Sequence, residues 1–348
     1  MATIIIRADA NDQIGMGHLV RCLDFASYAS EKGFNAEFLT STITAKEKIE
    51  TKGFKCININ TNYQDILIEM KNLSSNHNPI IMLLDINYCS TVEQRHAYFN
   101  FLKELDRLHL FLITFEDMST EVYPADIVII PYAGAESLKL QKEEGSQYLL
   151  GPKYFPIRKD YYNMTNKKYL KNVENILITM GGSDPNQITI KVVKALTKLK
   201  LNAHLIVVLG SLSKISNKQI ETLLSNYGGS FEVIKDAKYM PKLMNKSQLA
   251  ITNSGLTKYE MANMELPAIV ISNNSKHAKL MDDFSSYGTA VHLGNSDTVT
   301  EEKILSACTN LIKDKKKRKE MSIAGKRLVD GKGIERIFNC ITREYIYV

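Results

Sequence analysis

Tryptophan is absent from this chain of 348 residues, and no apolar run is long enough to cross a membrane. The first residues lead directly into a short apolar run, without the basic segment and cleavage site of a signal peptide. The five cysteines, at positions 22, 56, 89, 308 and 340, lack the paired spacing of a disulfide framework or a zinc site. We therefore expect a cytoplasmic protein with free thiols, no membrane insertion, no metal and no cofactor.

Charge gives little support for nucleic-acid binding. The formal net charge is +6, but much of the excess lies in residues 313–319, Lys-Asp-Lys-Lys-Lys-Arg-Lys. No aromatic residues interleave with this run, so we interpret it as a solvated helix end rather than an RNA-binding patch. A mildly positive field also suits an anionic nucleotide substrate. We expect no nucleic-acid partner.

Both halves of the chain alternate short apolar runs with amphipathic helical stretches, which is typical of βαβ units in a parallel sheet. The expected strands are residues 4–6, 36–39, 80–84, 110–115, 127–130, 175–179, 203–209, 231–234, 249–252, 268–271 and 289–293. A polar stretch at 158–172 separates the two series, so we place one domain at 1–157 and a second at 158–348. The predicted fold class is α/β, with two Rossmann-like doubly wound domains facing across a cleft. Ligands of such sheets bind at the carboxyl ends of the strands, so we expect the site in that cleft.

The first chemistry-bearing segment is Ile-Gly-Met-Gly-His at residues 14–18. Gly15 and Gly17 permit a tight turn after the first strand, and a helical pattern follows from residue 19. His18 then lies at the helix N-terminus, where the helix dipole favours a neutral, proton-accepting ring. A histidine that only caps its helix is the alternative.

Two further segments predict anion sites. Gly181, Gly182 and Ser183 follow a strand and present backbone N–H groups, with Pro185 expected as the first helical residue. No Lys-Ser or Lys-Thr pair follows at the spacing of a Walker A loop. A plain turn and helix start is the alternative interpretation.

The second anion segment covers residues 253–260, Asn-Ser-Gly-Leu-Thr-Lys-Tyr-Glu. Its backbone donors at Ser254, Gly255 and Leu256 precede a helix, and Glu260 lies one turn further, where a carboxylate can accept from a ribose diol. The pair Thr257 and Glu260 also fits a capping box, and the spacing alone favours the cap.

A family resemblance rests on four motifs: residues 7–9 (Arg-Ala-Asp), 14–22 (Ile-Gly-Met-Gly-His-Leu-Val-Arg-Cys), 181–185 (Gly-Gly-Ser-Asp-Pro) and 254–260 with Pro267. Together they resemble the PseG/SpsG family, whose best-known activity is UDP-2,4-diacetamido-2,4,6-trideoxy-β-L-altropyranose hydrolase. Asp85, Asp117 and residues 151–158 also resemble it, and the likeness covers about residues 3 to 290. The resemblance implies a GT-B fold related to MurG-type glycosyltransferases, with UDP held mainly by the C-terminal domain. It matches His18 to the catalytic histidine and Glu260 to the carboxylate that binds the uridine ribose.

One segment departs from the family pattern. Where relatives commonly carry Asn-Gln or His-Gln, residues 273–278 read Asn-Asn-Ser-Lys-His-Ala. His277 either replaces a polar contact or is a surface histidine, so the identity of the sugar stays open.

The expected reaction is hydrolysis of a UDP-sugar at the anomeric carbon. The resemblance implies that the sugar is a 2,4-diacetamido-2,4,6-trideoxyhexose, in pseudaminic acid or related nonulosonate biosynthesis for flagellin or other surface glycans. His18 acts as general base on a water, and the glycine-loop donors stabilise the departing UDP. Asp9 or Asp85 orients His18 or the sugar. The expected substrate-binding residues are Asp9, Gly15, Gly17, Arg21, Asp85, Gly181, Gly182, Ser183, Asn253, Ser254, Gly255, Leu256, Thr257, Glu260 and His277.

Two rival functions are open. A GT-B glycosyltransferase would use His18 to deprotonate an acceptor hydroxyl, but residues 41–49 are polar and show no membrane-facing patch of the kind such enzymes often carry. A non-catalytic nucleotide-sugar-binding subunit would not need the histidine loop. We expect a monomer or a weak homo-oligomer.

Overall fold

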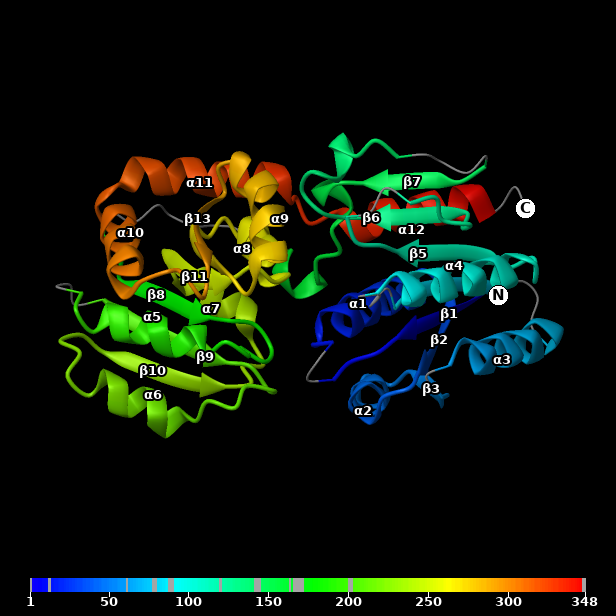
Figure 1. The fold of residues 1–348 in the computed structure, drawn as a ribbon, viewed down its shortest axis with the longest axis horizontal. Helices are drawn as coiled ribbons and strands as arrows, with labels where there is room; N and C mark the ends of the chain where they lie inside the picture. Colours follow the sequence, from blue (N-terminus) through cyan, green and yellow to red (C-terminus); the bar gives the residue numbers. More distant parts are fainter. Residues whose placement is uncertain are drawn as a thin grey trace. The chain divides into compact units, whose positions relative to one another are not determined.

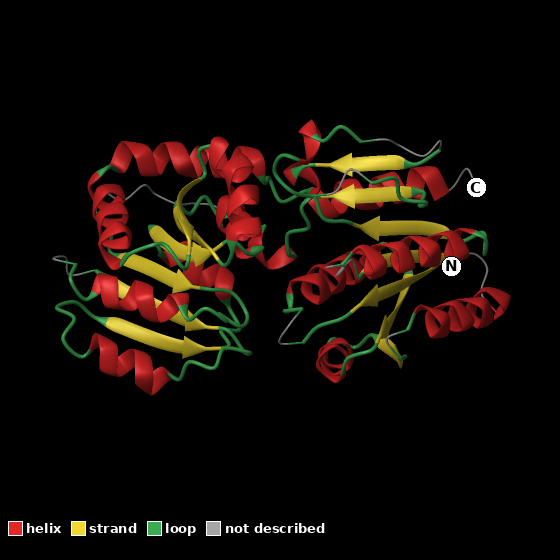
Figure 2. Cartoon of the chain, in the orientation of Figure 1, coloured by secondary structure: helices red, strands yellow, loops and turns green. Residues whose placement is uncertain are grey.

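The computed structural model describes residues 2–11, 14–60, 62–76, 80–86, 91–118, 121–140, 145–162, 164, 172–199 and 203–345, without the side chains of residues 75, 76, 276, 277 and 279. The chain forms two compact units (Figure 1). Unit 1 comprises Met1–Arg158 and Lys332–Val348, and unit 2 comprises Lys159–Gly331. In each unit the strands form one sheet with helices packed around it (Figure 2). None of the described helices combines the length and the apolar character that crossing a bilayer requires.

The sheet of unit 1 has the strand order β3-β2-β1-β4-β5-β6-β7 in the described residues, and every neighbouring pair is parallel. Its strands are β1 (Thr3–Ala8), β2 (Asn35–Thr40), β3 (Lys55–Asn58), β4 (Ile80–Asp85), β5 (Phe111–Phe115), β6 (Ile127–Ile130) and β7 (Gln147–Leu150). Its helices are α1 (Gly17–Glu31), α2 (Ile43–Thr51), α3 (Tyr63–Asn76), α4 (Val92–Asp106) and α12 (Gly333–Tyr345), with short 3-10 turns at Ala135–Ser137 and Pro152–Tyr154.

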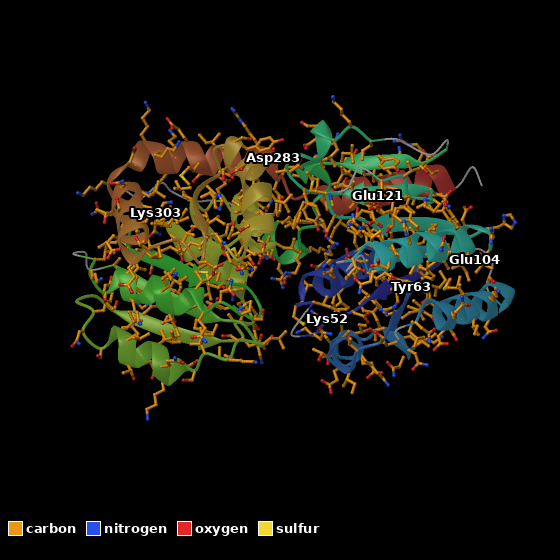
Figure 3. All side chains as sticks on the ribbon, in the orientation of Figure 1. Lys52, Tyr63, Glu104, Glu121, Asp283 and Lys303 are labelled. Atoms are coloured by element: carbon orange, nitrogen blue, oxygen red, sulfur yellow. The ribbon has the colours of Figure 1, made fainter. Side chains whose placement is uncertain are left out.

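Side chains of unit 1 alternate between two cores because successive strand residues face opposite sides of the sheet. Ile4 and Ile6 pack with α1, α2 and α12, whereas Ile5 packs with α3 and α4. On the second side Tyr63, labelled in Figure 3, stacks on Phe101 with ring centroids 4.5 Å apart. Helices therefore cover both faces, which leaves the strand ends and the loops for function.

The sheet of unit 2 has the order β10-β9-β8-β11-β12-β13 in the described residues, again parallel throughout. Its strands are β8 (Asn175–Thr179), β9 (His204–Leu209), β10 (Phe231–Lys235), β11 (Leu249–Asn253), β12 (Ala268–Ser272) and β13 (Ala290–Asn295). Its helices are α5 (Ile188–Leu196), α6 (Asn217–Leu224), α7 (Met240–Lys246), α8 (Thr257–Asn263), α9 (Ser275–Ser286), α10 (Glu301–Lys313) and α11 (Lys315–Leu328), after a 3-10 turn at Lys159–Tyr161. The core side chains of α5, α6 and α10 pack on β8, β9 and β11.

Helix α12 corrects the predicted domain assignment, because residues 332–348 belong to unit 1 and not to the second domain. Its buried residues Ile334, Ile337, Phe338 and Ile341 recur at helical spacing and join the core beneath α1. The ring of Phe338 lies 5.0 Å from that of Phe34 and 5.5 Å from that of Tyr28, measured between centroids. The sheet of unit 1 therefore completes its helical cover with residues that follow unit 2 in the chain.

Each strand expected from the sequence is present, but β3 and β7 were not expected. Both are four residues long and lie at the two edges of the unit 1 sheet. Edge strands are partly exposed, so Lys-Cys-Ile-Asn and Gln-Tyr-Leu-Leu lack the continuous apolar character that marks a buried strand.

Candidate active site

His18 and Asp85 meet at the carboxyl end of the unit 1 sheet. Asp85 is the last residue of β4, which pairs with β1, and His18 is the second residue of α1, which follows β1 through the glycine loop. The Nδ1 atom of His18 lies 2.7 Å from Oδ1 of Asp85. The Asp85 side chain is 1% exposed and that of His18 is 23% exposed. A buried carboxylate favours the proton on Nδ1, so the neutral ring carries its lone pair on Nε2.

Arg21 lies behind this pair, one helical turn after His18. Its Nε and Nη2 atoms each lie 2.5 Å from an oxygen of Asp85, and Nη1 donates to the Tyr132 hydroxyl at 2.7 Å. Burial would raise the pKa of Asp85, but the charge of Arg21, with that of His18, holds it well below its usual range. The guanidinium of Arg21 is buried against Asp85, Tyr132 and His18, and its expected contact with the substrate stays a prediction. Tyr132 was not predicted, since nothing in the sequence near it marks a site.

Asp9 does not contact His18. Its Oδ2 accepts from Nη2 of Arg7 at 2.7 Å, and its Oδ1 accepts from the Ser41 backbone N–H and the Thr40 hydroxyl, each at 2.8 Å. Burial raises its pKa, but the charge and hydrogen bond of Arg7, together with the hydrogen bonds from Ser41 and Thr40, lower the pKa overall. Of the two carboxylates expected to orient the histidine, Asp85 contacts it, and Asp9 instead joins the ends of β1 and β2. Asp9 and Asp85 are both buried, and their expected contacts with the substrate stay predictions.

The glycines of the histidine loop shape the backbone. Gly15 has a φ of +80°, a conformation that strains other residues, and its N–H donates to the Asn11 carbonyl at 2.7 Å. Gly17 opens α1 directly before His18. The hydrogen bond between Gly15 and Asn11 thus forms a turn, and His18 lies at the start of α1, as predicted.

In unit 2, Asn253 ties the two glycine loops together. Its Nδ2 donates to the Met180 carbonyl at 2.7 Å, and its Oδ1 accepts from the Gly255 N–H at 3.0 Å. Gly181 has a φ of +73°, and the Gly182 carbonyl accepts from the Leu212 N–H at 3.0 Å. The loop at residues 180–183 and the loop at residues 253–256 are therefore neighbours at the carboxyl ends of β8 and β11.

Asp184 accepts hydrogen bonds at the start of α5, the helix that follows the first of these loops. Helix α5 begins at Ile188, so the expectation that Pro185 is its first residue is wrong. The Asp184 carboxylate accepts from the N–H groups of Ile188 and Thr189, at 2.8 and 2.9 Å. Because a protein carboxylate occupies this helix N-terminus, an anion at the loop is left with the N–H groups of Gly181, Gly182 and Ser183. The capping role of Asp184 was missed because Pro185 is a common first helical residue.

The capping box expected at Thr257 and Glu260 is absent. The N-cap of α8 is Leu256, and no side-chain capping hydrogen bond forms there. Glu260 lies half-buried on the first turn of α8. Nearby, the hydroxyls of Ser254 and Thr252 are buried with no hydrogen-bond partner among the described residues. The loop thus presents polar groups that its own helix does not use.

His277 and a possible metal site are the remaining questions from the sequence. His277 falls in α9, but its side chain is outside the described residues, so both interpretations of it stay open. Within the described part of the chain, no three His, Cys, Asp or Glu side chains gather as a metal site.

Comparison with known proteins finds one domain family and two curated relatives. Residues 175–336 match the model of the glycosyltransferase family 28 C-terminal domain. An uncharacterised protein of Methanocaldococcus jannaschii is 31% identical over 304 residues, which are 83% of this chain and 60% of that protein. The spore coat polysaccharide biosynthesis protein SpsG of Bacillus subtilis is 30% identical over 200 residues, which are 56% of each chain. The match therefore covers less than two thirds of either relative.

Solved structures share the fold along the whole chain. MurG of Acinetobacter baumannii has a TM-score of 0.70 at 14% identity, covering 98% of this chain and 99% of that protein. MnaA of S. aureus, solved with UDP, has a TM-score of 0.59 at 16% identity, covering 100% of this chain and 97% of that one. At such identities the likeness shows the fold alone, and it confirms the predicted GT-B class.

Proposed function

Because the chain is a distant homologue of SpsG with a GT-B fold and a glycosyltransferase family 28 C-terminal domain, we propose that it hydrolyses a UDP-linked sugar and releases UDP and the free sugar. The homology supports an enzyme of the glycosyltransferase-like superfamily. The observation that carries the proposed general base, on which the hydrolysis depends, is the contact of His18 with buried Asp85. The proposed substrate is a UDP-linked 2,4-diacetamido-2,4,6-trideoxyhexose of a nonulosonate pathway, and cytoplasmic location and a monomeric or weakly associating state belong to the same proposal.

His18 is the proposed general base. Its Nε2 takes a proton from water while the water oxygen bonds to the anomeric carbon, and UDP leaves with the electron pair of the glycosidic bond. Attack from the side opposite UDP inverts the anomeric configuration. Asp85 stabilises the imidazolium that forms, and Arg21 keeps Asp85 ionised.

Unit 2 is the proposed UDP-binding unit. The backbone N–H groups of Gly181, Gly182 and Ser183, with that of Leu256, are assigned to the diphosphate, whose negative charge grows as the bond breaks. Glu260 is assigned to the ribose hydroxyls. The family 28 domain match over residues 175–336 and the fold shared with MnaA, solved with UDP, support this assignment.

A glycosyltransferase is the second candidate, and the family 28 domain favours it. In that reaction His18 would deprotonate an acceptor hydroxyl instead of water. The side chain of Ile43 at the start of α2 is 75% exposed, which weakens the argument against a transferase drawn from the polar character of residues 41–49.

The experiment is UDP release from UDP-2,4-diacetamido-trideoxyhexoses and UDP-GlcNAc, with and without added acceptors. We expect release without acceptor, and a loss of about 10²- to 10⁴-fold in His18→Ala. His204→Ala is the matched control, because His204 lies at the opposite, amino end of β9 in unit 2. Release only with acceptor would establish the transferase, and UDP binding without any release would establish a binding subunit.

A further inference from the structure

Lys258 is a buried amine with no carboxylate partner in the part of the chain that the structure describes. The residue is 9% exposed and lies in the first turn of α8. Its Nζ atom lies 4.6 Å from the ring centroid of Tyr259 and 5.5 Å from that of Phe284. Burial lowers the pKa of this amine to about 7. Burying an amine without a counter-charge is unfavourable, so the hydrogen bonds of Lys258 must offset that cost. The groups that accept them therefore show which part of the structure the amine stabilises.

Lys258 binds the backbone of the second glycine loop. Its Nζ donates to the Ser254 carbonyl at 2.7 Å and to the Gly255 carbonyl at 3.2 Å. In a trans peptide the C=O and the following N–H point in opposite directions. Fixing the Gly255 carbonyl toward the amine therefore directs the Leu256 N–H away from it.

Asn253 fixes the same loop from its other side. Turning the Ser254 carbonyl toward Lys258 directs the Gly255 N–H to Oδ1 of Asn253, at 3.0 Å. Among the described residues the Leu256 N–H has no acceptor, and the buried Ser254 hydroxyl has no partner. One backbone donor is thus held in a fixed direction and left available.

We propose that Lys258 is a positioning residue for diphosphate recognition, holding the carbonyls of Ser254 and Gly255 so that the Leu256 N–H faces the UDP diphosphate. The inference rests on the proposed role of unit 2 in binding UDP. An apolar side chain of the same length would fill the space among Tyr259 and Phe284 but could not orient the loop.

The test compares binding of UDP and of uridine, which lacks phosphate, by titration calorimetry and competition. The variant is Lys258→Met. The matched control is Lys326→Met, because Lys326 is also a partly buried lysine of unit 2, donates to the Asn263 carbonyl at 3.3 Å and has a pKa lowered by burial. We expect Lys258→Met to weaken UDP binding about ten- to a hundred-fold with uridine binding unchanged, and Lys326→Met to bind both as the wild type does.

Equal UDP affinity in Lys258→Met and wild type would overturn the inference while leaving the proposed function intact. So would an equal loss for UDP and uridine, which indicates general damage to the fold. A wild type that binds no UDP would overturn the proposed function itself. If Lys258→Met does not fold, Lys258→Gln, which keeps a shorter polar donor, is measured against the same criteria.

Discussion

At the residue scale, the placement of His18 depends on an ion pair between two other side chains, Asp85 and Arg21. Asp85 is fully buried, and Arg21 supplies both the opposite charge and two hydrogen bonds. A buried carboxylate without such a partner would take up a proton and stop accepting from the histidine. The position and orientation of the His18 ring are therefore held by side chains that water does not reach.

We predict that Asp85→Asn lowers kcat about 10²- to 10⁴-fold, because an amide neither stabilises the imidazolium nor fixes the same tautomer. UDP release under saturating substrate measures this. Asp126→Asn is the control, since Asp126 is a partly buried carboxylate of unit 1 that accepts from the Leu112 N–H at 2.6 Å. A kcat near that of the wild type in Asp85→Asn would exclude the His18–Asp85 pair from the chemistry.

The histidine could be predicted from the sequence, but its partner could not. His18 is marked by the glycines before it and by the change from strand to helix pattern after it. Asp9 is nearer in sequence than Asp85, yet Asp9 is taken by Arg7 and by the end of β2. Choosing Asp85 requires the pairing of β1 with β4, which periodicity does not supply.

At the element scale, the two glycine loops of unit 2 are stabilised by opposite charges. After the first loop a carboxylate, Asp184, accepts from the N–H groups that begin α5. After the second loop an amine, Lys258, donates to carbonyls that precede α8. The capping pattern expected from the sequence predicts neither set of hydrogen bonds. An aspartate or a lysine near a helix start can serve several roles, and tertiary contacts decide which one it takes.

We predict that Asp184→Ala destabilises the protein by about 0.5 to 2 kcal/mol, because two N–H groups of α5 lose their acceptor. Asp184 also has a φ of +46°, which alanine tolerates less well than asparagine. Urea unfolding of Asp184→Ala and Asp184→Asn measures both effects. A smaller loss for the alanine variant than for the asparagine variant would contradict the capping role.

Lys258 gives a prediction for the pH dependence of stability. Its pKa is about 7 in the folded chain and about 10.4 when unfolded, so between these values the unfolded state binds one proton more. Stability of the wild type should therefore rise with pH by up to about 1.4 kcal/mol per unit in this window, and not below pH 7. Denaturant unfolding at pH 7 and 9 should show a smaller rise for Lys258→Met, and equal rises would contradict the prediction.

At the scale of the whole molecule, the two parallel sheets could be predicted from the sequence and their division could not. The apolar runs of the buried strands are visible along the chain, and the fold class is confirmed. The assignment of α12 was wrong because its amphipathic pattern shows that it packs on a sheet, but not on which one. That choice rests on the aromatic contacts of Phe338 with α1 and the residues after it.

We predict that Phe338→Ala destabilises unit 1 by about 3 to 5 kcal/mol and leaves unit 2 unchanged. Phe338 is 4% exposed and contacts rings of α1, so its loss leaves a cavity. Hydrogen exchange, read separately for amides of β1 and β8, should show faster exchange only in unit 1. Equal acceleration in both units would mean that they unfold as one.

The return of α12 to unit 1 also sets an order of events during translation. Residues 332–345 complete the helical cover of the β1 sheet, and they are synthesised after all of unit 2. Unit 2 can close its core on the ribosome as soon as Gly331 has emerged, whereas unit 1, although begun first, stays incomplete until α12 leaves the exit tunnel. The unit that carries His18 therefore matures after unit 2.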